Sequence, residues 1–223
     1  MYISRKKNIL VLLILFTSCT FIFANNKNYN FFATLGPSIL VNTDDSTKSA
    51  PSPVLFTVGV GADLLTNKII SIQPKISLFT NYYLWDGESP RPAEVENRTA
   101  QVISSLIDLD IFHSFKFSKN EVQIGGGIGI LARYGVLAFG VAKDDKGGTS
   151  EQNAGEDVKS INNWFFKDLN YLYPNIMISY TRTLNSGWKA GIESKLYFPL
   201  GSLMNNNNFD SAIISFGLKL CTK

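Results

Sequence analysis

The chain has 223 residues, of which 45% are hydrophobic and 17% are charged, and its length alone predicts a single domain. Its formal net charge of +3 comes from Arg5, Lys6 and Lys7, because the rest of the chain holds 18 basic and 18 acidic residues. A balanced chain lacks the basic patch of a nucleic-acid-binding protein, so we expect no nucleic acid among its partners. Aromatic residues at 13% and 17 glycines favour a β-rich fold.

The N-terminal segment has the three parts of a secretory signal peptide. Residues 5–7 form a basic start, residues 9–16 an apolar centre, and Phe21-Ile22-Phe23-Ala24 ends in a small residue suited to cleavage. We therefore predict a signal peptide over residues 1–24 and one mature domain over residues 25–223.

Two alternatives for this segment stay open. An uncleaved helical anchor is disfavoured because polar residues 17–20 interrupt the apolar run, which is shorter than the ~20 residues of a helical span. Cys19 is instead a lipidation site if Phe16-Thr17-Ser18-Cys19 acts as a loose lipobox, although the apolar residues after it are unlike a polar tether. After cleavage only Cys221 remains, so the mature chain forms no internal disulfide.

The mature sequence alternates apolar and polar residues with the period of a β-strand. At residues 56–64, for example, Phe56, Val58 and Val60 share one face, and Thr57 lies on the other. The same pattern recurs at residues 70–78, 103–116, 121–133, 188–198 and 211–220, and less cleanly at about Tyr29–Val41 and Trp164–Arg182. These segments predict eight strands, each with one face in an apolar medium and one in a polar medium.

The predicted connections alternate between long and short. In chain order they are Asn42–Ser52, Thr66–Lys68, Asp86–Arg98, Ser118–Asn120, Ala142–Asn163, Thr183–Gly187 and Gly201–Asn208. Outer-membrane barrels have short periplasmic turns and longer outside loops, and an even strand count leaves both termini periplasmic. We therefore expect the polar faces inside a closed barrel and the apolar faces in lipid, because an open sheet edge in hydrocarbon is prohibitively costly.

Aromatic residues are predicted to form two belts at the membrane interfaces. The outer belt comprises Tyr82, Trp85, Tyr134, Trp164, Phe165, Tyr171, Tyr173, Tyr197 and Phe198. The inner belt comprises Tyr29, Phe31, Phe115, Phe117, Tyr180 and Trp188. Pro74 falls inside a predicted strand, where proline is normally confined to an edge or a bulge, so we predict a bulge there.

The inward faces carry six charged residues: Lys75, Asp108, Asp110, Arg133, Glu193 and Lys195. The strand registers predict Lys75 level with Asp108 or Asp110, and Arg133 near Asp108. Charges in a narrow barrel must be paired, so we expect a structural ion-pair network. The alternative is that these charges gate a narrow passage. Gly125, Gly127 and Gly129 would then leave room in the lumen, because they carry no side chain.

The sequence predicts no active site. His113 is the only histidine, and it points away from the neighbouring Ser114 because adjacent strand residues face opposite sides. Residues 125–129 are glycine-rich but lack the lysine and the following helix of a phosphate loop. We expect no cofactor, no metal and no enzymatic activity.

On these patterns the chain resembles the small outer-membrane β-barrel proteins of the OmpW, OmpX and OmpA transmembrane-domain type, over residues 25–223 and without a residue-specific motif. The resemblance implies an all-β fold, a closed eight-stranded antiparallel up-and-down transmembrane barrel in the bacterial outer membrane. Such barrels usually end in an aromatic residue, whereas this chain ends Leu218-Lys219-Leu220-Cys221-Thr222-Lys223. Either Phe216 takes that role or the C-terminal assembly signal is specific to the lineage.

Three functions remain open at this point. The first is a structural or surface-interaction barrel whose loops, especially Ala142–Asn163, bind host or environmental ligands. The second, implied by the OmpW resemblance, is a narrow channel for small or apolar solutes. The third is a soluble ligand-binding barrel of lipocalin type, with its apolar face inside. For the membrane protein we expect a monomer, with outer-membrane lipid and the barrel-assembly machinery as partners.

Overall fold

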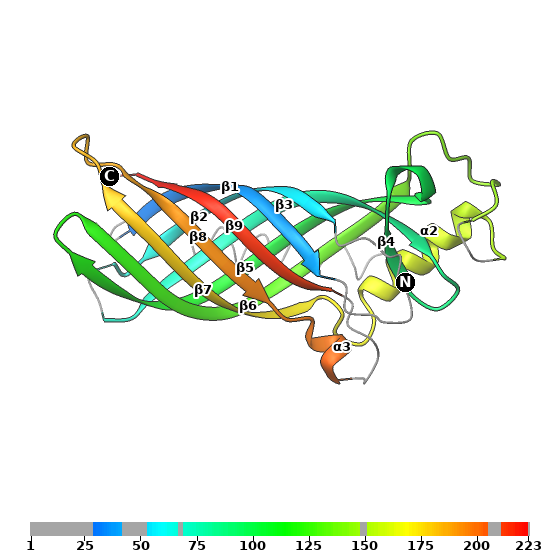
Figure 1. Ribbon diagram of the computed structural model, residues 1–223. Helices are drawn as coiled ribbons and strands as arrows, with labels where there is room; N and C mark the ends of the chain where they lie inside the picture. The colour runs from blue at the N-terminus through cyan, green and yellow to red at the C-terminus, as the bar shows by residue number, and fades with distance from the viewer. Residues whose placement is uncertain (1–28, 42–52, 67–68, 148–150, 205–210, 223) are drawn as a thin grey trace, which may run out of the picture.

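The computed structural model describes residues 29–41, 53–66, 69–147, 151–204 and 211–222, so the predicted signal peptide and Cys19 lie outside the described residues. Eight strands pair in antiparallel fashion with their chain neighbours, and the first pairs with the last, which closes the barrel (Figure 1). They are β1 Tyr29–Val41, β2 Val54–Leu64, β3 Ser71–Trp85, β5 Ala100–Phe117, β6 Asn120–Leu137, β7 Leu172–Thr183, β8 Lys189–Tyr197 and β9 Ala212–Cys221. The prediction of a closed eight-stranded antiparallel barrel is confirmed.

Four shorter elements lie in the long connections, at the end of the barrel away from Cys221 (Figure 1). They are β4 Pro90–Ala93, the 3-10 helix η1 Val95–Asn97, and the helices α2 Ala154–Phe165 and α3 Leu200–Met204. We call this end the outer end and the end with the short turns the inner end. No helix in the described part of the chain is long and apolar enough to span a membrane.

Helix α2 corrects one predicted strand. The segment Trp164–Arg182 was expected to be extended, but α2 runs to Phe165 and β7 begins only at Leu172. The helix starts where the side chain of Asn153 accepts a hydrogen bond from the Glu156 N–H, and acidic residues fill its first turn. Aromatic content alone suggested a strand, whereas the cap and the 3.6-residue period of its buried face specify a helix.

The barrel is polar inside and apolar outside. In β5, Ile111 is 56% exposed on the outer face, whereas the neighbouring Asp110 is fully buried in the lumen. In β2, Phe56 and Thr57 alternate in the same way. A lipocalin-type barrel would have the opposite polarity, so this alternative is wrong.

Pro74 causes no bulge. The register between β3 and β5 continues unbroken through Pro74, which lies opposite Leu109. On its other side, the pairing of β2 with β3 lapses between Gly61, opposite Lys75, and Leu64, without any inserted residue. The ladder therefore accommodates the missing N–H by losing local pairing on one side.

The inner aromatic belt faces outward as predicted, with Phe31, Phe117 and Trp188 all exposed. The outer belt is partly wrong. Tyr134 is exposed on the outer face, but four predicted members are buried: Trp85, Phe165, Tyr173 and Tyr197. Tyr173 and Tyr197 pack inside the lumen, whereas Trp85 and Phe165 pack in a second cluster where α2 meets the barrel.

Candidate functional site

The lumen is the candidate site, and its inner half is filled by buried charges of alternating sign. Lys75 Nζ lies 2.7 Å from Glu193 Oε1. Lys219 Nζ lies 3.4 Å from Glu193 Oε2 and 3.4 Å from Asp63 Oδ1. These contacts join β2, β3, β8 and β9 across the lumen, and all four side chains are buried.

A second group of charges lies further toward the outer end. Lys195 forms an ion pair with Asp110, and its Nζ is 3.1 Å from Asp108 Oδ2. Tyr197 donates its hydroxyl to Asp108 Oδ2 at 2.8 Å, and Asn175 donates its amide to Asp110 Oδ1 at 2.8 Å. One ammonium thus lies between two carboxylates that also accept neutral hydrogen bonds, an arrangement that compensates the cost of burying them.

The strand registers agree with one predicted pairing and contradict another. Lys75 is level with Asp108, as expected, but its ammonium bonds to Glu193 across the lumen. Arg133 lies opposite Ser104, four residues from Asp108 along β5, so the predicted proximity of Arg133 to Asp108 is wrong. Its guanidinium points toward the outer end.

Sequence reasoning missed three buried charged members of the network: Asp63, Glu121 and Lys219. Asp63 and Lys219 are each almost fully buried, and both bond to the amide of Gln123, at 3.3 Å and 3.1 Å. The alternation of β2 and β9 already placed both side chains on the inward face. The sequence therefore contains the signal that places Asp63 and Lys219 in the lumen.

The three lumen glycines of β6 lie close against the neighbouring strand β5. An added Cβ would lie 2.6 Å from Phe112 Cβ at Gly125, 2.6 Å from Asp110 Oδ1 at Gly127 and 2.9 Å from Asp108 Oδ1 at Gly129. Backbone and side-chain atoms of β5 occupy the room that Gly125 and Gly127 provide. The glycines therefore admit the neighbouring side chains to the lumen.

Above the charges lies a ring of apolar side chains, one from each of the eight barrel strands. Its members, all buried, are Leu40, Leu55, Phe79, Leu106, Leu131, Tyr173, Tyr197 and Ile213. An interior of eight strands is just wide enough for side chains to fill. This ring therefore fills the lumen with packed side chains between the buried charges and the outer mouth.

Helix α2 covers the outer mouth above this ring. Ile161 and Phe165, both fully buried, pack against the outer ends of β3 and β5. The Arg133 guanidinium lies 4.0 Å from the centroid of the Phe165 ring, a cation–π contact, and donates to the Asn170 carbonyl at 2.9 Å. Arg133 thus links the barrel wall to the cap.

His113 lies away from the lumen. Its Nδ1 is 2.6 Å from the Ile69 carbonyl oxygen, and its ring packs edge-on against Phe115 on the outer face. No group of three or more His, Cys, Asp or Glu side chains in the described ranges could hold a metal ion. The expectations of no metal, no cofactor and no catalysis stay predictions.

No protein-family model and no curated protein matches the chain. Solved structures do: Neisserial surface protein A is 8% identical with a TM-score of 0.52, over 87% of this chain and 96% of that chain. The outer membrane protein OprG from Pseudomonas aeruginosa is 9% identical with a TM-score of 0.50, over 88% of this chain and 97% of that chain.

These similarities show the fold: the chain has the architecture of small outer-membrane β-barrel proteins, as the sequence predicts. The outer membrane enzyme PagL is also similar, at 12% identity and a TM-score of 0.38, over 86% of this chain and 99% of that chain. Fold alone does not determine function, so the absence of enzymatic activity stays a prediction.

Proposed function

We propose that this protein is an integral barrel of a bacterial outer membrane that acts as a closed scaffold and presents its outer loops to ligands. The proposal rests on the ring of eight apolar side chains, one from each barrel strand. This ring lies between the buried ion pairs and the α2 cap. The ion pairs, the apolar ring and the α2 cap are three successive barriers in one lumen, and together they favour a closed scaffold over a channel. The apolar outer face supports insertion into lipid.

The orientation follows from the distribution of turns. At the inner end only two residues separate β5 from β6, whereas β6 and β7 are joined at the outer end through α2. Outer-membrane barrels keep short turns in the periplasm. We therefore propose that Tyr29 and Cys221, which both lie at the inner end, are periplasmic.

The outer end carries an exposed aromatic residue beside a half-buried arginine, a combination suited to recognition. Phe139 is 89% exposed, and Arg98 Nη2 donates to its carbonyl at 3.0 Å. The Arg98 guanidinium also lies 5.3 Å from the centroid of the Tyr82 ring. Aromatic and arginine side chains are enriched at the centres of binding surfaces, so we place ligand contact here.

Conductance in planar bilayers tests the closed scaffold. Purified protein is expected to insert and to give no steady single-channel current. A current that Asp108→Asn alters would overturn the proposal in favour of the narrow channel. Heat-modifiable gel migration and recovery in the outer-membrane fraction test the location, and recovery in the soluble periplasmic fraction would overturn it.

Recognition is tested on an array of host glycans and matrix proteins with detergent-solubilised protein. Phe139→Ser is expected to abolish any binding that the parent protein shows. Met204→Ser is the matched control, because Met204 is also exposed at the outer end, at 66%, but lies on α3. Equal binding by the parent and Phe139→Ser, or no binding by the parent, would contradict this assignment.

A further inference from the structure

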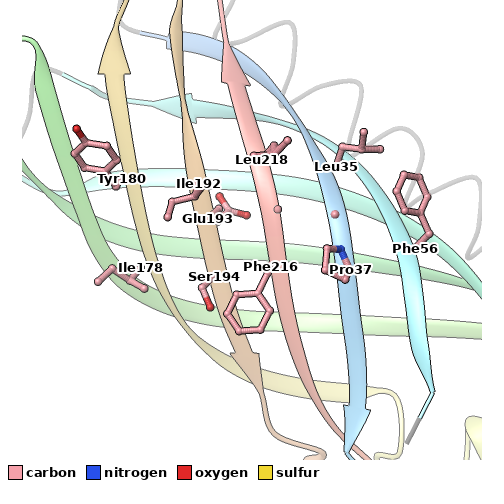
Figure 2. Close-up of a pocket in the computed structure, with 12 residues that line it drawn as sticks. Leu35, Pro37, Phe56, Ile178, Tyr180, Ile192, Glu193, Ser194, Phe216 and Leu218 are labelled. Atoms are coloured by element: carbon pink, nitrogen blue, oxygen red, sulfur yellow. The ribbon is translucent and has the colours of Figure 1, made fainter.

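A recess of about 490 Å³ crosses the outer face of the barrel where β1 and β9 close the sheet (Figure 2). Leu35 and Pro37 of β1 form one part of its lining, and Phe216 and Leu218 of β9 form the other. Ile192 of β8 lies beyond β9, as Figure 2 shows. A barrel wall is normally convex on this side, so a hollow here needs a cause.

The recess coincides with an interruption in the backbone ladder of the seam. Pairing between β1 and β9 skips from Leu35, opposite Leu218, to Ser38, opposite Ser215. Pro37 has no N–H to donate to the ladder. At Gly36 an added Cβ would collide with the carbonyl oxygen of Phe216, so only glycine allows this close approach of the strands.

Apart from Glu193 and Ser194 of β8, and the hydroxyl of Tyr180, the lining is apolar. Leu218 is 67% exposed, Phe56 64% and Ile192 59%, and all three are side chains of the outer face. In a bilayer no water is available to fill such a hollow, because the surrounding medium is hydrocarbon. The occupant that matches this lining is therefore a hydrocarbon chain.

We propose that this recess, which we call the seam groove, holds one acyl chain of a phospholipid as a discrete bound lipid. The inference rests on the proposed location in the outer membrane. The seam groove is continuous with the apolar outer face on both sides, and a flexible chain can follow its floor. A second barrel would present a convex wall, which leaves the groove unfilled.

The groove also indicates the leaflet. Tyr180 lines its inner end, is 42% exposed and donates its hydroxyl to Asn120 Oδ1 at 2.9 Å, beside the short turn between β5 and β6. Tyrosines in this position lie at the headgroup level of a membrane. The bound lipid is therefore a phospholipid of the inner, periplasmic leaflet.

Native mass spectrometry of the full mature protein, folded in detergent with palmitoyl-oleoyl phosphatidylethanolamine, tests the seam groove. The parent protein is expected to retain one phospholipid after detergent removal. Ser194→Phe places a ring in the groove and should lower the retained fraction by about tenfold, because each displaced methylene costs binding energy. Ser105→Phe, on the outer face of β5 and outside the groove, is the matched control and should retain the lipid.

The result separates this inference from the function on which it rests. If the folded parent enters vesicles and shows heat-modifiable migration but retains no lipid, the seam groove proposal is wrong and the membrane location stands. Equal retention by Ser194→Phe and the parent also overturns the groove. Failure of the parent to enter vesicles overturns the membrane location itself.

Discussion

The side-chain amide of Asn162 bonds to both backbone groups of Gly135. Its Oδ1 accepts the Gly135 N–H at 2.8 Å, and its Nδ2 donates to the Gly135 carbonyl at 2.9 Å. The two residues belong to α2 and β6, so this pair of bonds fixes the cap to the wall in a defined position. Together with Arg133 under Phe165, it makes α2 part of the barrel's packing.

Asn162→Ala should loosen the cap and leave the barrel folded. The variant loses both bonds and leaves two half-buried backbone groups without these partners, at a cost of about 1–3 kcal/mol. Hydrogen exchange should accelerate in residues 154–165 and stay slow in the strands. Asn163→Ala, at an exposed neighbouring position, is the control and should exchange like the parent.

Asn162→Ala also tests whether the apolar ring or the α2 cap blocks the lumen. The apolar ring lies below α2, so Asn162→Ala should still give no current in planar bilayers. A current that appears with the loosened cap would show that α2 alone closes the lumen, and would contradict the role given to the ring.

Lys195→Met should destabilise the barrel strongly. The substitution leaves Asp108 and Asp110 buried without their bonded cation, and breaking a buried ion pair in this way costs about 3–5 kcal/mol. Urea unfolding in detergent micelles, followed by the folded and unfolded bands on gels, measures the loss. Lys167→Met removes an exposed pair with Asp168 and should change stability by less than about 1 kcal/mol. Similar midpoints for both variants would contradict a structural network.

Alternation predicted the faces of the six strands whose apolar and polar residues alternate cleanly, because the same period of two applies along each of them. A residue between two lipid-facing neighbours must point inward, and this rule places Glu193 and Lys195 in the lumen from the sequence alone. Partners across the lumen were harder to predict. Lys75 bonds to Glu193 of β8, and no pattern in neighbouring strands specifies which long side chains meet across a barrel.

The outer end was predicted least well, because several structures compete there for the same aromatic residues. Trp164 and Phe165 fit an interfacial belt by composition, yet they belong to a helix whose start is specified by Asn153. Tyr197 shows the opposite case, since alternation alone placed it inward and only its position near a strand end suggested a belt. When the strand face of an aromatic residue and its closeness to a strand end give different predictions, the strand face gives the correct one. The face determines whether the aromatic ring packs inside the barrel.

Gly127→Ala should impair folding, whereas Gly135→Ala should be tolerated. A methyl group at Gly127 would meet the Asp110 carboxylate at 2.6 Å and the adjacent backbone of β5. At Gly135, in the same strand, the nearest atoms lie at 3.6 Å, an ordinary contact. The yield of heat-modifiable protein after refolding into micelles measures the difference. Equal yields would contradict the view that the glycine row makes room for β5 side chains.

The turn after β3 should open in acid, because its geometry depends on an ionised Asp86. Partial burial raises the pKa of Asp86, but the N–H groups of Ser89 and Glu88 and the Arg91 guanidinium outweigh it, so the pKa lies below its ordinary value. Arg91 Nε donates to Asp86 Oδ2 at 2.6 Å, and Ser89 N–H donates to Oδ1 at 2.7 Å. A carboxyl with a lowered native pKa stabilises the turn fully above its unfolded pKa, and this contribution disappears as the pH falls through the native pKa.

Proteolysis or hydrogen exchange of residues 86–93, followed from neutral pH into the acid range, measures this effect. The parent turn should be protected at neutral pH and lose protection only below the ordinary range of an aspartate. Asp86→Asn should be less protected at neutral pH and show no such transition, because its side chain does not ionise. Glu88→Gln retains the backbone N–H that Asp86 accepts and should follow the parent. A transition in Asp86→Asn at the same pH would assign the acid sensitivity to another group and refute the role of Asp86.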